Sequence, residues 1–141
     1  QAHPDVSAVI SVNKGLVTQA SAAIPVVPLY FAILYKVMKK AGNHENCIQQ
    51  IARLFTQKLY TSEGFLTDEN GFIRMDDYEL TPEIQEEVKK CWEAVTTDTV
   101  NEYCDIDGYW EDFYHMFGFR YEDIDYTQDV DADVEIDGII I

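Results

Sequence analysis

The sequence predicts an α/β region that is mostly helical, with one core strand and at least four helices. The strand is indicated by Ala8–Val12 (AVISV), a β-branched run that residues 13–15 (NKG) close like a loop. The helices are indicated by the apolar and capping patterns that fill most of the remaining chain. Because a lone buried strand must find the rest of its sheet elsewhere, we expect these 141 residues to be part of a larger α/β protein.

A long apolar helix is predicted from Ser21 to the glycine at position 42. Ser21 is a suitable N-cap, and Pro25 and Pro28 are tolerated only near a helix start. Three lysines near its end suit the negative pole of the helix dipole. The helix is apolar nearly all round, which predicts burial.

A second helix is predicted over Glu45–Tyr60, with one apolar face that should point inward. That face consists of Ile48, Ile51, Ala52, Phe55 and Leu59. Gly71–Asp76 then predicts a short strand or a hairpin arm.

Two further helices are predicted in the acidic half of the chain. The first is capped by Thr81, has Pro82 at its first position and runs to about Thr96. Val88, Trp92 and Val95 form its inner side. The second covers Asp107–Phe117, is rich in aromatic residues and ends at Gly118. Acidic and apolar residues alternate over Asp123–Ile141, as in a strand or an extended tail.

The charge is strongly acidic and unevenly distributed. Ten basic against 26 acidic residues give a net charge of −16. Residues 1–60 carry a net charge of +4, so residues 61–141 carry −20. This balance argues against a nucleic-acid partner or an anionic membrane surface, because clustered Lys and Arg hold phosphates.

The cysteines indicate the redox compartment of the protein, and the apolar runs indicate whether it can span a membrane. Three cysteines without a CxxC spacing argue against a disulfide framework and a zinc site, and favour a reducing cytoplasm. The longest apolar run, Ala22–Tyr35, has 14 residues and two prolines, too few to span a bilayer.

Three patterns suggest chemistry, each with a structural alternative. Tyr35 and Lys39 have the spacing of a general-acid pair, but core packing of Tyr35 and a helix-end charge on Lys39 are the favoured explanation. The acidic residues after Asp123 resemble a calcium loop that lacks its glycine and its twelfth ligand, so no metal is expected. His44 and Cys47 are three apart, with no second ligand pair.

Longer segments resemble one enzyme family along nearly the whole chain. They are residues 9–40, which include the specific motifs LVTQAS (16–21) and AIPVVPLY (23–30), HENCIQQIARLFTQKLY (44–60), IRMDDYEL (73–80), EIQEEVKKCWEAVT (83–96), GYWEDFYHMFGF (108–119) and DIDYTQDVDADV (123–134). Their order is similar to that in the trans-2-enoyl-CoA reductases, also called FabV-type enoyl-acyl carrier protein reductases. Those proteins are longer, and residues 1–141 resemble their C-terminal part only.

The resemblance implies a cytoplasmic oxidoreductase with a Rossmann-type, short-chain dehydrogenase-like sheet that acts in fatty acid metabolism. Such an enzyme uses NADH to reduce the 2,3 double bond of an enoyl-CoA or enoyl-ACP thioester, and a tyrosine and a lysine in a Tyr-x8-Lys arrangement assist at the enolate. In the family this pair and the glycine-rich cofactor loop precede the segment seen here. The chain would therefore supply the last core strand, a substrate-lid helix and a helical C-terminal region. It would lack a complete dinucleotide-binding domain and be inactive without the remainder of its polypeptide.

The resemblance also implies site residues. Leu16, Val17 and Thr18 match the loop that contacts the cofactor near its nicotinamide, and a hydroxyl plus free amides after a strand suit that contact. In structural terms Thr18 is also a candidate helix cap. Val27, Phe31 and Tyr35 share a helix face that is either an acyl pocket lining or core. The alternative to the reductase is a non-enzymatic acidic helical interaction module.

Overall fold

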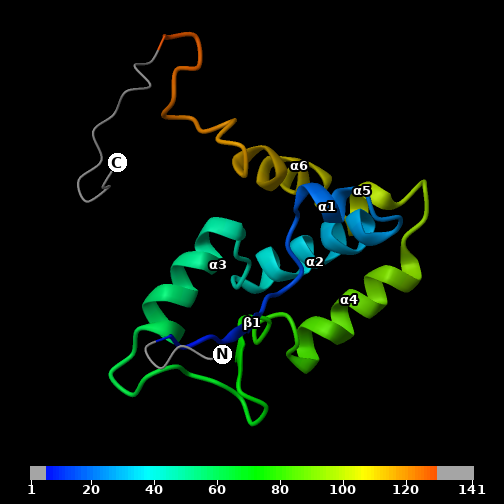
Figure 1. Ribbon diagram of the computed structural model, residues 1–141. Helices are drawn as coiled ribbons and strands as arrows, with labels where there is room; N and C mark the ends of the chain where they lie inside the picture. Colours follow the sequence, from blue (N-terminus) through cyan, green and yellow to red (C-terminus); the bar gives the residue numbers. More distant parts are fainter. Residues whose placement is uncertain (1–5, 130–141) are drawn as a thin grey trace.

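The computed structural model describes residues 6–129, in which a central helix carries most of the core (Figure 1). The elements are β1 (Ile10–Val12), α1 (Gln19–Ala22), α2 (Val27–Ala41), α3 (Cys47–Arg53), the π-helix η1 (Leu54–Leu59), β2 (Phe72–Arg74), α4 (Pro82–Ala94), α5 (Val100–Tyr103) and α6 (Ile106–His115). The chain after α6 leads away from the helices as far as residue 129 (Figure 1).

The strand β1 pairs with β2, which confirms the short strand predicted within Gly71–Asp76 and corrects the expectation of one core strand. It lies parallel to β2, with Ile10 opposite Phe72 and Val12 opposite Arg74. Parallel pairing excludes a hairpin arm, because a hairpin joins antiparallel strands. The sheet described here has only these two strands, and Ile10 remains 60% exposed.

The helix predicted from Ser21 is in fact two helices. Thr18 is the N-cap of α1, since its Oγ1 accepts a hydrogen bond of 3.0 Å from the Ser21 amide. The break before α2 follows from Pro28, because a proline inside a continuous helix clashes with the carbonyl four residues earlier. Val26 has a φ of 73°, an unfavourable angle for a β-branched residue. The predicted end at Gly42, with a φ of 76°, is confirmed.

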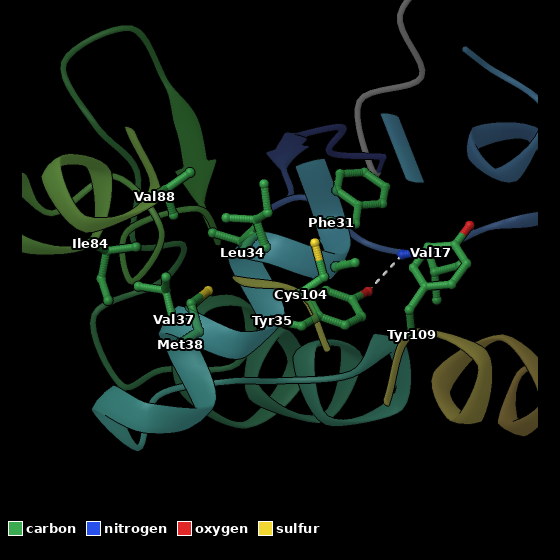
Figure 2. Close-up of a cluster of buried hydrophobic side chains, with 12 residues drawn as sticks. Val17, Phe31, Leu34, Tyr35, Val37, Met38, Ile84, Val88, Cys104 and Tyr109 are labelled. Atoms are coloured by element: carbon green, nitrogen blue, oxygen red, sulfur yellow. Dashed lines mark hydrogen bonds between the residues drawn. The ribbon is translucent and has the colours of Figure 1, made fainter. Parts of the chain in front are cut away.

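The helix α2 is buried, as its apolar composition predicts. It packs against α4 and α6. Its buried residues are Phe31, Ala32, Ile33, Leu34, Tyr35, Val37 and Met38. Figure 2 shows how side chains from the loop before α1, from α4 and from α6 complete this cluster, among them Val17, Val88 and Tyr109.

The predicted inward face of the second helix points outward. Ile48, Ile51 and Phe55 are 58%, 48% and 46% exposed, whereas Gln50 and Arg53 are buried. This orientation leaves a row of apolar side chains uncovered by residues 6–129. Contiguous exposed apolar side chains are typical of a surface that another element or a partner covers.

The inward-facing Arg53 explains this orientation. Its Nε lies 2.7 Å from Glu45 Oε1, and its two terminal nitrogens donate to Asp77 Oδ1 at 2.9 Å and to the Met75 carbonyl at 2.8 Å. The charge of the buried guanidinium is paired with two carboxylates, and both of its terminal nitrogens have acceptors, which offsets much of the cost of burying it. The polar side of α3 therefore faces the protein.

The later helices agree with their start and stop signals. Thr81 caps α4, Pro82 is its first residue, and the helix ends at Ala94, two residues before the predicted end. Val88 is buried as predicted, but Trp92 is 40% exposed. The helix α6 begins one residue earlier than predicted and ends at His115, two residues before the predicted end, and the short α5 was not predicted.

Candidate functional site

The candidate site is the loop of residues 13–18, which follows the carboxyl end of β1. In open α/β sheets, ligands bind beyond this end of the strands. The loop contains Leu16, Val17 and Thr18, the three residues predicted to contact the cofactor. Val17 is buried, Leu16 is half-buried and Thr18 is exposed.

Three amides of this loop are bound within the protein. The Gly15 amide donates to Glu79 Oε2 at 2.5 Å, the Val17 amide to the Tyr35 hydroxyl at 2.9 Å and the Thr18 amide to Ser21 Oγ at 2.8 Å. The assumption that these amides are free is therefore wrong. Of the three residues predicted to contact the cofactor, Leu16 is the one whose amide has no hydrogen-bond partner among residues 6–129, so this amide is left for a ligand.

The hydroxyl of Thr18 is partly used by the helix cap. It accepts from the Ser21 amide and donates to Ser21 Oγ at 3.0 Å. A hydroxyl oxygen has two lone pairs, so one acceptor position remains. Because Thr18 is exposed, that position can reach a ligand.

The predicted acyl face lies on α2 beside this loop. Phe31 and Tyr35 are buried with stacked rings 6.3 Å apart, and Val27 is half-buried. The dashed line in Figure 2 is the bond from the Val17 amide to the Tyr35 hydroxyl. This bond joins the predicted cofactor loop to the predicted acyl face. In residues 6–129 the two aromatic rings are packed as core.

A group of buried polar side chains surrounds Tyr35. The Lys14 amine lies 5.0 Å from the centre of the Tyr35 ring, and burial lowers the pKa of Lys14 to about 8. The His44 ring is 4.4 Å from that of Tyr35, and its Nε2 lies 3.1 Å from Asp112 Oδ2. Sequence analysis missed Lys14 and Asp112, because the partners of this cluster come from distant segments.

The alternative general-acid pair does not form. Lys39 Nζ lies 2.7 Å from Asp105 Oδ2, so its charge is paired with the N-cap residue of α6. Burial raises the pKa of Tyr35, whereas a tyrosine that acts with a lysine needs a lowered pKa. The pair is therefore structural, and the Tyr-x8-Lys pair expected of the family is a different one.

The described residues contain neither a metal-binding cluster nor a helix that could span a membrane. Within residues 6–129, no three His, Cys, Asp or Glu side chains gather into a metal site. The Asp125 carboxylate of the calcium-like segment instead accepts hydrogen bonds from Thr127 and Gln128, and the part of that segment from residue 130 onward lies outside the described residues. None of the helices between residues 6 and 129 has the length and apolarity to cross a bilayer.

Two family models match adjacent parts of the chain. Residues 1–60 match the trans-2-enoyl-CoA reductase catalytic region, and residues 67–130 match the enoyl reductase FAD binding domain. An NADH-dependent enoyl-[acyl-carrier-protein] reductase of Cytophaga hutchinsonii is 50% identical over 133 residues, 94% of this chain and 34% of the relative's length. An NADH-dependent trans-2-enoyl-CoA reductase of Ruminiclostridium cellulolyticum is 49% identical over 94% of this chain and 33% of its own.

Solved structures of trans-2-enoyl-CoA reductases also resemble this chain over about a third of their length. The trans-2-enoyl-CoA reductase of Treponema denticola, in complex with NAD, has a TM-score of 0.80 and 48% identity over 90% of this chain and 32% of its own. That of Clostridium acetobutulicum, also with NAD, has a TM-score of 0.78 and 48% identity over 88% of this chain and 32% of its own. The chain thus spans about a third of the length of the relatives it matches.

The second matching description mentions FAD, and the described residues do not fit it. Residues 67–129 carry four basic against 19 acidic residues, and their glycines are at least ten residues apart. A flavin dinucleotide carries a pyrophosphate, which proteins hold with clustered amides or positive charge. No step of the chemistry is therefore assigned to a flavin.

Proposed function

Because this chain is a partial region of the trans-2-enoyl-CoA reductase family, we propose that it is the C-terminal part of an NADH-dependent reductase of enoyl thioesters. The observation that carries the proposal is the 50% sequence identity to the Cytophaga hutchinsonii reductase over 94% of the chain. The loop after β1 supports it, because it leaves a hydroxyl and an amide for a ligand at the expected end of the strand. The non-enzymatic module has no comparable observation in its favour.

In this proposal Leu16, Val17 and Thr18 hold the nicotinamide end of NADH. A nicotinamide carboxamide has both donor and acceptor atoms. The free Leu16 amide can donate to its oxygen, and the remaining lone pair of Thr18 Oγ1 can accept from its nitrogen. When bound, NADH supplies a hydride to the β-carbon of the substrate's double bond.

The helix α2 would form part of the acyl site through Val27, Phe31 and Tyr35. Apolar and aromatic side chains suit an acyl chain, and the bond between Tyr35 and Val17 keeps this face next to the cofactor loop. The acyl carrier can be coenzyme A or acyl carrier protein. The three cysteines are free thiols, which agrees with a cytoplasmic enzyme.

The proposal requires further polypeptide to complete the enzyme. The Tyr-x8-Lys pair, the dinucleotide cradle and the remaining strands would come from it. Two exposed apolar surfaces support this requirement, namely Ile10 on β1 and the row of Ile48, Ile51 and Phe55.

The test is NADH oxidation with crotonyl-CoA, measured for the full-length protein and for residues 1–141 alone. We expect turnover by the full-length protein only. In the full-length protein, Thr18→Val should raise the KM for NADH, whereas Thr18→Ser, which keeps the hydroxyl, should not. Turnover by residues 1–141 alone, or an inactive full-length protein, would contradict the proposal.

A further inference from the structure

Glu79 joins the two halves of the chain at the candidate cofactor loop. It lies in the turn before α4 and is only 7% exposed. Its Oε2 accepts a hydrogen bond of 2.5 Å from the Gly15 amide, and its Oε1 accepts one of 2.7 Å from the Tyr30 hydroxyl. One buried carboxylate therefore holds both the residue before Leu16 and the first half of α2.

The turn that carries Glu79 is itself fixed. Gln85 Nε2 donates to the Glu79 carbonyl at 3.0 Å, and the Leu80 amide donates to the Asp76 carbonyl at 2.9 Å. Because these bonds fix the backbone of the turn, the Glu79 side chain starts from a fixed Cα when it binds the loop, which favours accurate placement of its two oxygens.

The loop is also closely packed at the point where Glu79 binds it. A Cβ on Gly15 would lie 2.7 Å from Phe31 Cε1 and 3.2 Å from Leu34 Cδ2. A glycine is therefore needed for the close approach, and the Gly15 amide can reach the carboxylate. The position of Leu16 and Thr18 depends on this contact, because they follow it directly in the chain.

We propose that Glu79 is a positioning residue for the nicotinamide cofactor, which it acts on through Gly15 and the loop of residues 16–18. The inference rests on the proposed function. It gives a role to residues 67–130, the segment matched by the FAD binding description. This segment would serve NADH binding by holding the loop that belongs to the catalytic region.

The test compares two substitutions of Glu79 in the full-length reductase. Glu79→Met keeps the length of the side chain but removes both acceptors, so the Gly15 amide loses its partner. Glu79→Gln can keep both bonds, because its oxygen accepts from Gly15 while its NH2 donates to a rotated Tyr30 hydroxyl. We expect Glu79→Met to raise the KM for NADH about tenfold, equivalent to about 1.4 kcal/mol, with kcat within about threefold. Glu79→Gln should stay within about threefold for both constants.

The matched control is Glu93→Met, a glutamate of α4 whose side chain is 65% exposed and whose carboxylate lies 3.9 Å from Lys89 of the same helix. It should leave both constants unchanged. If Glu79→Met fails to fold, Tyr30→Phe removes one of the two bonds and should raise the KM for NADH about threefold at constant kcat.

Two results would overturn the inference while leaving the proposed function intact. One is an unchanged KM for NADH in Glu79→Met, or in Tyr30→Phe where that variant replaces it. The other is a lower kcat with an unchanged KM, which means only a smaller folded fraction. An inactive wild-type protein would overturn the proposed function and the inference together.

Discussion

Replacing Tyr35 with phenylalanine tests the hydrogen bond that joins the loop to α2. Tyr35 is completely buried, and its hydroxyl accepts the Val17 amide at 2.9 Å. The substitution removes the acceptor and leaves a buried amide without a partner, which costs about 1–3 kcal/mol. Tyr109→Phe is the matched control. Its hydroxyl is buried with no partner among the described residues, and its ring centre lies 6.4 Å from that of Tyr35.

The assay is amide hydrogen exchange of the peptide containing Val17, measured in the full-length protein. A loss of 1–3 kcal/mol of local stability corresponds to exchange that is about 5-fold to 140-fold faster in Tyr35→Phe. Tyr109→Phe should leave the exchange rate of Val17 within about twofold of wild type. Equal rates in Tyr35→Phe and wild type, or equal acceleration by both substitutions, would refute the reasoning.

Three further predictions concern the same loop. The folded-state pKa of Lys14, about 8, lies below its ordinary value of 10.5. Between these two pH values the unfolded state binds more protons than the folded state. The free energy of unfolding should therefore rise by about 2 kcal/mol from pH 8 to 10. Urea unfolding should show that Lys14→Met abolishes this rise, and a slope that persists would contradict the assignment to Lys14. Above pH 10 the raised pKa values of Tyr30, about 12, and of the buried Tyr35 should lower stability again, and Tyr30→Phe should make this decrease smaller in the same titration. Gly15→Ala should lower the melting temperature, because its Cβ overlaps Phe31 at a cost of about 1–3 kcal/mol, and an unchanged melting temperature would show that the ring moves freely.

The sequence predicts the elements whose signals are local. Thr81 and Pro82 begin α4, and Gly42 ends α2, because capping and backbone angles depend on a few neighbouring residues. Leu16, Val17 and Thr18 were found through resemblance, and the position of their loop after a strand is confirmed. Their contact with a cofactor stays a prediction.

Features that depend on distant partners could not be predicted. The face of α3 is set by Arg53, whose partners include Asp77 and Met75, so its apolar pattern alone gives the wrong orientation. The parallel pairing of β1 with β2 joins residues about sixty positions apart. Glu79 carries no local signal, because its role depends on Gly15, 64 residues away.

Two attachments, five residues apart on α2, fasten the loop to this helix. One runs from Gly15 through Glu79 to Tyr30, and the other from Val17 to Tyr35. Phe31 lies between them in the sequence, in the space beside Gly15 that a larger residue would need. Loop and helix therefore move as one body, and any molecule that displaces the loop also changes the shape of the surface around the Phe31 ring.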